Sequence, residues 1–282
     1  MTAVPIPATA ERSEAEAFFD VVVGAPEPVR AALGTAGTRV GGGVAVSMRR
    51  DPTGFWSKAL GMGFDEPVTA DLIEEVCAFY RAQETPSAVL QLAPSVLPEN
   101  WAEICAKAGL SAGSTWLKLA GETDVVVRHA SASQRPPTGL RVAAVENGQA
   151  GMWGSVMLRA FGMPEGSLAE MAGAAVGRPG WHSFATWDGS DLVGGGAMHV
   201  HQDTAQFFSG ATLPQARGRG GQSALLAARA RAAQAAGCGW LIAETRAGAP
   251  GSRNSSLHNT LRLGFRVLYE RQDWIWRPTG GE

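Results

Sequence analysis

The sequence predicts an α/β fold with a mixed sheet, built from two halves of similar size. Strand-like and helix-like segments alternate along residues 140–277, and residues 14–129 end in the same order of elements. Between them, residues 130–139 carry Pro136 and Pro137 among small polar residues. A proline pair cannot continue a helix or a central strand, so we place a domain boundary there. The two domains are therefore predicted at 14–129 and 140–277.

The composition predicts a folded protein. Hydrophobic residues make up 45% of the 282 residues, charged residues 18%, and the net charge is −2. Such a charge argues against a nucleic-acid binder that works by general attraction to phosphates. We see no apolar stretch long enough to span a bilayer and no signal peptide, so we expect no membrane partner. The three cysteines lack ligand-like spacing, which predicts no metal site and a cytoplasmic location.

The second half reads as alternating strands and helices. The long helix is rich in alanine and stops at Gly237, as glycine just past a helix end usually does. Arg229 and Arg231 within it are expected on a solvated face. The predicted strands are 140–145, 181–187, 192–201, 205–213, 240–245 and 266–276, and the predicted helices are 149–161, 168–176, 221–236 and 255–263.

The first half shows the same pattern near its end. Apolar residues recur at helical spacing over residues 69–84, a strand is predicted at 88–92, a helix at 99–107 and a strand at 114–119. Each half thus closes with helix, strand, helix, glycine and strand, which suggests an old duplication. Residues 1–13 are rich in Pro, Ala and Thr and are expected to fray.

A glycine-rich turn joins a predicted strand to the long helix. Pro214 ends strand pairing because it has no N–H donor, and Arg-Gly-Arg-Gly-Gly follows at 217–221. Glycines let backbone N–H groups approach a ligand, and the first helical turn has unpaired N–H groups and a positive dipole end. This pattern predicts an anion site suited to a phosphate or pyrophosphate, to which Arg217 and Arg219 can add charged hydrogen bonds.

Two nucleotide-binding motifs fit this turn less well. A phosphate-binding Walker A loop needs Gly-Lys-Ser/Thr, which is missing. The dinucleotide fingerprint G-x-G-x-x-G is met at Gly218 and Gly220, but Ser223 holds the third place. Glu244 ends the next strand, where that fold keeps its ribose-binding acid. A dinucleotide-binding oxidoreductase therefore stays open as an alternative.

The segment Arg217 to Gln222 resembles the R-x-x-G-x-G/A loop of the GNAT acyltransferase superfamily, and "NTLRLGF" at 259–265 resembles its later helix and Gly-Phe step. The resemblance covers about half the chain. It implies a GNAT-type N-acetyltransferase with two GNAT-like halves, using acetyl-CoA as co-substrate. Gln222 departs from the family's small residue and is expected to point outward. By the resemblance, the coenzyme-binding residues are Thr212, Leu213, Arg217, Gly218, Arg219, Gly220, Gly221, Gln222, Ser223 and Asn259.

The resemblance also bears on catalysis. The family often has a tyrosine acid where this chain has Thr260, so we consider Tyr269 as the acid and Glu244 as the base or amine anchor. The acceptor is expected to be a small-molecule amine or a peptide, and a homodimer is one candidate assembly. The missing tyrosine leaves a non-catalytic acyl-CoA-binding or regulatory protein as a second alternative. The first half has Asp65 and Glu66 before its helix, and like charges repel phosphates, so that half is predicted to be a degenerate copy.

Overall fold

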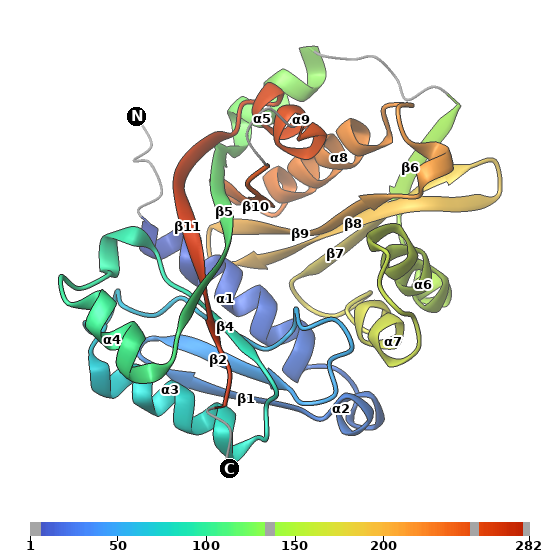
Figure 1. Ribbon diagram of the computed structural model, residues 1–282. Helices are drawn as coiled ribbons and strands as arrows, with labels where there is room; N and C mark the ends of the chain where they lie inside the picture. The colour runs from blue at the N-terminus through green and yellow to red at the C-terminus, as the bar shows by residue number, and fades with distance from the viewer. Residues whose placement is uncertain (1–6, 133–138, 249–253, 279–282) are drawn as a thin grey trace. The chain divides into compact units, whose positions relative to one another are not determined.

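The fold is described from a computed structural model, which covers residues 7–132, 139–248 and 254–278 (Figure 1). It is an α/β fold in which helices pack on mixed β-sheet, as the sequence predicts. The predicted linker falls mostly on residues 133–138, outside the described residues.

The chain divides into two compact units, which are described separately. Unit 1 consists of Met1–Lys118 and Leu268–Glu282, and unit 2 is Leu119–Val267. The last strand of the chain therefore contributes most of its residues to unit 1. The predicted domains, 14–129 and 140–277, have different bounds from these two units, and the domain assignment and the duplication both stay predictions.

Unit 1 has the strand order β1-β2-β3-β4-β11-β5. Strand β3 runs parallel to β4, and β11 runs antiparallel to β4, with Ile275 opposite Val89. Helix α3 buries Ile73, Val76 and Tyr80 in the core of this unit. Its elements are α1 (Pro7–Val23), α2 (Glu27–Leu33), β1 (Thr35–Val40), β2 (Gly43–Met48), β3 (Lys58–Leu60), α3 (Ala70–Ala82), β4 (Ala88–Gln91), α4 (Trp101–Ala108), β5 (Ser111–Glu122) and β11 (Arg266–Trp276).

Unit 2 has the strand order β5-β10-β9-β8-β7-β6. Strands β6 to β9 form an antiparallel meander, and β10 is parallel to β9. A doubly wound dinucleotide fold needs a mostly parallel sheet, so this topology does not favour the oxidoreductase alternative. Its elements are α5 (Thr123–Ala132), β6 (Leu140–Ala144), α6 (Ala150–Phe161), α7 (Ser167–Gly173), β7 (Trp181–Asp188), β8 (Asp191–His201), β9 (Thr204–Thr212), α8 (Gly221–Ala235), β10 (Trp240–Arg246) and α9 (Ser255–Arg262).

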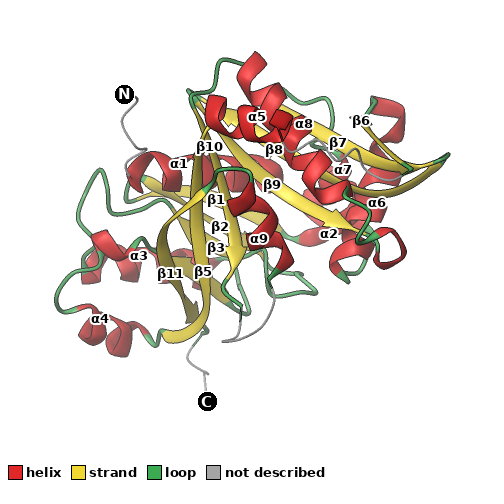
Figure 2. Ribbon diagram, turned by 90° about the horizontal axis from the view of Figure 1, so that it is seen from above, coloured by secondary structure: helices red, strands yellow, loops and turns green. Residues whose placement is uncertain are grey.

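Helices cover both faces of the unit 2 sheet (Figure 2). Gly195 faces α6, because a Cβ placed there would lie 2.5 Å from Trp153 Nε1. The next residue, Gly196, faces α8, since its Cβ would lie 3.1 Å from Arg229 Cζ. Successive residues of a strand point to opposite faces, so α6 and α8 lie on opposite sides of β8.

The start of the chain differs from the sequence prediction. Helix α1 begins at Pro7, so the prediction that residues 1–13 fray is wrong for residues 7–13. Within that stretch Glu11 is 1% exposed. Burial of an acidic residue is unusual unless it is paired, and its partners lie far away in the sequence.

Those partners form a buried charged network in unit 1. The carboxylate of Glu14 contacts the ammonium of Lys118 and accepts a 2.8 Å hydrogen bond from Arg271 Nη2. Arg271 also pairs with Glu11, whose Oε1 accepts a 2.8 Å hydrogen bond from Tyr269. Lys118 and Arg271 are both 0% exposed. The network fixes α1 against strands β5 and β11 within this unit.

Candidate functional site

The site in unit 2 begins where β9 ends. Pro214 opens a short 3₁₀ turn, Pro214–Ala216, and α8 starts at Gly221. Gly218 and Gly220 have φ angles of 77° and 83°, a left-handed conformation that favours glycine. These two residues turn the chain so that the first N–H groups of α8 point out of its N-terminal end. The strand, turn and helix predicted from the sequence are confirmed.

Strand β9 separates from β10 before reaching this turn. Their parallel pairing covers only Thr204 to Gln206 on β9. On its other edge, β9 carries a bulge: Gly196 pairs with Gly210 and Ala197 with Phe208, so Ser209 has no counterpart on β8. Ser209 has a φ of 47°, which is uncommon for a residue other than glycine. The bulge redirects the strand where pairing with β10 has ended.

A cavity of about 1000 Å³ opens at this place. Such a volume lies at the upper end of the usual range for small-molecule sites, about 300–1,000 Å³. The cavity is lined by the end of β9, the turn, the first turns of α8, and one face of α9. Of the residues predicted to bind coenzyme, all line it except Leu213: Thr212, Arg217, Gly218, Arg219, Gly220, Gly221, Gln222, Ser223 and Asn259.

The lining is strongly basic. Arg217, Arg219, Arg231 and Arg262 contribute, together with His258. Among the described residues that line the cavity there is no Asp or Glu. Four guanidinium groups and a helix N-terminus around one cavity favour an anion with several negative charges.

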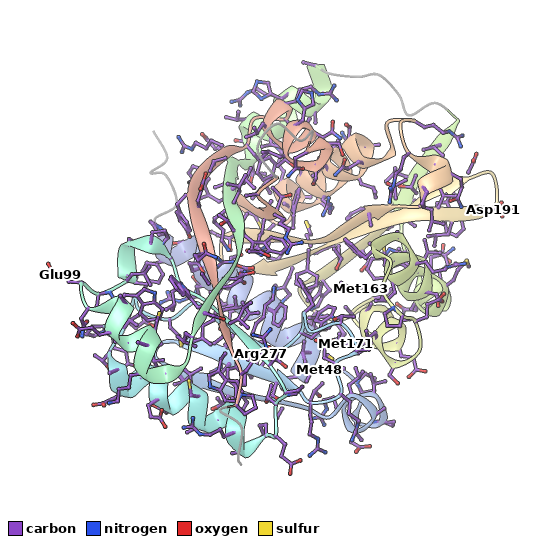
Figure 3. All side chains as sticks on the ribbon, in the orientation of Figure 1. Met48, Glu99, Met163, Met171, Asp191 and Arg277 are labelled. Atoms are coloured by element: carbon purple, nitrogen blue, oxygen red, sulfur yellow. The ribbon has the colours of Figure 1, made fainter. Side chains whose placement is uncertain are left out.

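The two arginines of the turn are held in different ways. Arg217 donates from Nε to the carbonyl oxygen of Thr212 at 3.0 Å. Arg219 makes a bidentate contact with Asp188, with 3.0 Å between Nη2 and Oδ1. These hydrogen bonds lower the pKa of Asp188. Asp188 closes β7 beside the hairpin that leads to Asp191, which is labelled in Figure 3. Arg219 thus links the glycine-rich turn to the end of β7 in the antiparallel meander.

Helix α9 is joined to the start of α8 by side-chain hydrogen bonds. Asn259 donates from Nδ2 to Gln222 Oε1 at 2.7 Å, and Gln222 donates from Nε2 to Ser256 Oγ at 3.2 Å. Arg262 reaches Ser223 Oγ at 3.2 Å. The expectation that Gln222 points outward is wrong, because its amide links the two helices. Asn259 lines the cavity, as expected, but its amide is already engaged.

The predicted catalytic residues lie outside this lining. Glu244 is half-buried on β10 in unit 2 and is not among the described residues of the cavity. Tyr269 belongs to unit 1, where its hydroxyl donates to Glu11. Burial and the nearby Glu11 carboxylate raise the pKa of Tyr269 well above its ordinary value. Thr260 is buried, and its hydroxyl donates to the Ser256 carbonyl within α9 at 2.9 Å.

Unit 1 has a different structure at the corresponding place. The side chain of Thr69 caps α3, accepting a 3.2 Å hydrogen bond from the Leu72 N–H. A Cβ at Gly63 would lie within 2.8 Å of Val68 and Val96, so apolar side chains fill the space beside this loop. Asp65 forms an ion pair with Arg12 at 2.7 Å. These features agree with the prediction that this half binds no coenzyme. That absence stays a prediction.

Three basic residues of the cavity were not predicted from the sequence. Arg231 was expected on a solvated face; it is exposed, yet it lines the cavity two turns beyond Ser223. Arg262 and His258 lie on the cavity face of α9. The spacing of Asn259 and Arg262, three residues apart on a helix, was the one signal that could have revealed Arg262.

Among the described residues, no helix combines the length and apolar character needed to cross a membrane. No group of three or more His, Cys, Asp or Glu side chains among them is arranged to hold a metal ion.

Comparisons with known proteins identify the fold. No family model matches the sequence, and a search of curated proteins finds no match. Among solved structures, a GCN5-related N-acetyltransferase from Kribbella flavida is 17% identical, with a TM-score of 0.65 over 99% of this chain and 98% of its own. A tandem GNAT protein from the clavulanic acid biosynthesis pathway is 14% identical, with a TM-score of 0.59 over 99% of both chains.

A third structure, a GCN5-related N-acetyltransferase from Sphaerobacter thermophilus, is 16% identical with a TM-score of 0.57 over 99% of this chain and 96% of its own. At sequence identities of 14–17%, the similarity shows a shared fold and no more. Together with the bulged, splayed strand and the glycine turn, it establishes that this chain has the fold of the GCN5-related N-acetyltransferases, in an arrangement that extends over nearly its whole length.

Proposed function

We propose that the protein is an N-acyltransferase that takes an acetyl group from acetyl-CoA and transfers it to an amine. One observation carries the proposal: the cavity joins the N-terminal end of α8, four arginines and the splayed end of β9 without a lining carboxylate among the described residues. This set of groups suits a long ligand with a polyanionic end and a neutral, amide-bearing arm.

Coenzyme A has those two parts. Its diphosphate fits the first turn of α8, where residues 218–223 supply N–H groups and Arg217 and Arg262 supply charge. Arg231 lies eight residues after Ser223 on α8, about 12 Å further along the helix axis. We assign Arg231 to the phosphate on the ribose, which is separate from the diphosphate in the coenzyme.

The pantetheine arm is assigned to the end of β9. Pairing with β10 stops at Gln206, and Gly210, Ala211 and Thr212 line the cavity beyond it. An extended chain with two amide groups can hydrogen-bond to a strand edge in the manner of an added strand. This places the thioester towards the bulged part of β9.

The reaction needs three proton or charge events. The acceptor ammonium loses a proton, its nitrogen attacks the thioester carbon, and the carbon–sulfur bond breaks to give a thiolate that takes up a proton. Glu244 is the proposed base or amine anchor. Tyr269 remains the proposed acid, although its raised pKa makes proton donation harder. His258 lines the cavity and is an additional candidate.

Binding and turnover test the proposal separately. Calorimetry with acetyl-CoA should give saturable binding to the full chain. Release of free thiol from acetyl-CoA should then rise with one class in a panel of small amines, amino acids and peptides with free N-termini. Lack of acetyl-CoA binding at millimolar concentration would refute the proposal.

A non-catalytic acyl-CoA-binding role is the second candidate. It is favoured by the hydroxyls of Thr260 and Tyr269, both of which are engaged in hydrogen bonds within the protein. Tight binding of acetyl-CoA with no thiol release above the buffer rate across the whole panel would support this role over catalysis.

A further inference from the structure

Arg229 is a buried cation in the middle of α8. It is 4% exposed, and among the described residues of unit 2 it is the only Lys, Arg, Asp or Glu buried to this degree. The sequence placed it on a solvated face, which is wrong. A buried charge is costly unless polar groups surround it, so its position calls for a reason.

The guanidinium group is held by neutral groups. Nη1 donates to the carbonyl oxygen of Ala197 at 3.1 Å, and Nε donates to that of Leu225 at 3.3 Å. Its Cζ lies 4.4 Å from the centre of the Phe207 ring, close enough for a cation–π contact. Burial lowers the pKa of Arg229 to about 9, so the side chain keeps its charge at neutral pH. No described carboxylate contacts it, in contrast to the buried Arg271 of unit 1.

Two glycines make room for this group. A Cβ at Gly196 would lie 3.1 Å from Arg229 Cζ, and a Cβ at Gly210 would lie 3.3 Å from Nη2. Gly196 and Gly210 are paired across β8 and β9. The register shift follows directly, between Gly196 and Ala197, and Ala197 supplies the carbonyl that Arg229 binds. The guanidinium therefore lies against the bulge that Ser209 introduces.

The residues that follow the bulge on β9 line the cavity. Gly210 lines it, followed by Ala211 and Thr212. From the contacts at Gly196, Ala197 and Gly210 we infer that Arg229 is a positioning residue, which holds the bulge and keeps residues 210–212 in place for the pantetheine arm and thioester of an acyl-coenzyme A. This inference rests on the proposed function, and it assigns Arg229 no contact with the ligand.

The two ends of the coenzyme should respond differently to the loss of Arg229. Loss of Arg229 should disturb residues 210–212 but leave the first turn of α8, which receives the diphosphate. Arg229→Met keeps the length and apolar stem of the side chain without its charge or donors. It should weaken acetyl-CoA binding about tenfold, as a small misplacement of binding groups does. Binding of adenosine 3′-phosphate 5′-diphosphate, which lacks pantetheine, should change less than about twofold, because its groups do not reach β9.

A second variant alters the same contact from the side of strand β8. Gly196→Ala adds a methyl group against Arg229 Cζ, and Gly196 does not line the cavity. It should reproduce the selective loss of acetyl-CoA affinity even if Arg229→Met folds poorly. Arg231→Met is the matched control on the same helix, and it should weaken both ligands because Arg231 is assigned to the ribose phosphate.

Calorimetry with both ligands, on variants whose circular dichroism matches the wild type, decides the matter. Selective loss of acetyl-CoA affinity in Arg229→Met and Gly196→Ala supports the inference. Unchanged affinity for acetyl-CoA, or equal loss for both ligands, overturns it while the proposed function stands. A wild-type protein that binds neither ligand would remove the proposed function, and this inference with it.

Discussion

The side-chain amide of Asn259 donates to Gln222 across 2.7 Å, so a residue of α9 is bonded to the second residue of α8. Both residues also line the cavity. Gln222 stands where the GNAT loop has a small residue, and its extra length is what reaches α9. The bond therefore makes the geometry of the anion site depend on the position of α9.

Replacing either partner should weaken coenzyme binding. Gln222→Ala and Asn259→Ala each remove one net hydrogen bond, worth about 0.5–1.5 kcal/mol, and loosen α9. Acetyl-CoA affinity should fall about three- to tenfold in each single variant and little further in the double variant. Calorimetry on all four proteins measures the coupling. Fully additive losses would mean that the two residues act independently.

Gly220 should be indispensable for the anion site. Its φ of 83° strains any other residue, and Gly220→Val also places a branched side chain beside the N–H groups of α8. We expect acetyl-CoA binding to be abolished while circular dichroism stays unchanged. Gly237→Val is the matched control, because Gly237 follows the other end of α8 with a φ of 78° and open space around it. It should lower stability but keep affinity; equal loss of binding in both variants would contradict the assignment.

Arg231 should distinguish coenzyme A from its form without the ribose phosphate. In the wild type, removing that phosphate should weaken binding about tenfold, since one charge-assisted contact is worth about 1.5–3 kcal/mol. Arg231→Gln should bind the two forms almost equally. Raising the salt concentration should narrow the preference in the wild type, as exposed charges are screened. A preference that persists in Arg231→Gln would place the ribose phosphate elsewhere.

Low pH should destabilise unit 1. Burial alone would raise the pKa of Glu14, but Arg271 and Lys118 outweigh it and leave the pKa well below its ordinary value. A carboxylate with a lowered pKa in the folded state stabilises the fold above its unfolded pKa of about 4.3, and this contribution is lost as the pH falls below that value. Thermal unfolding should therefore occur at progressively lower temperature below about pH 4.3.

Glu14→Gln tests the source of this effect. It leaves Lys118 and Arg271 without one charged partner, which should lower the free energy of unfolding at pH 7 by about 3–5 kcal/mol. It should also flatten the acid dependence of the melting temperature. Glu74→Gln is the control, since Glu74 pairs with Arg81 at the surface and should have little effect. A melting curve as acid-sensitive as that of the wild type would refute the role of Glu14.

Local rules made the strand, turn and helix around the cavity predictable. Pro214, the glycines of the turn and the alanine-rich helix each have conformational preferences that act within a few residues, so the strand, turn and helix could be placed from the sequence alone. Gly264, which follows α9 and has a φ of 94°, was likewise predictable as the end of that helix. The cation lining was only partly predictable, because Arg231 and Arg262 join it through the way α8 and α9 pack.

The charged interior was not predictable, for a physical reason. Glu14 and Lys118 are 104 residues apart, and nothing in the local sequence of α1 indicates that its acidic face meets two cations. Arg229 likewise looks like any charged residue on a helix. Its burial becomes intelligible only when Gly196 and Gly210, on two strands, are seen to leave space for the guanidinium.

Because most of β11 belongs to unit 1, the two units are completed in a fixed order as the chain is synthesised. Unit 1 needs Leu268–Glu282, including Arg271, whereas every residue of unit 2 leaves the ribosome earlier. Of the two units, unit 1 is thus completed later, because Glu11 and Glu14 meet Arg271 only after all of unit 2 has been synthesised. A premature stop codon shortly before Leu268 would leave unit 2 whole and unit 1 unfinished.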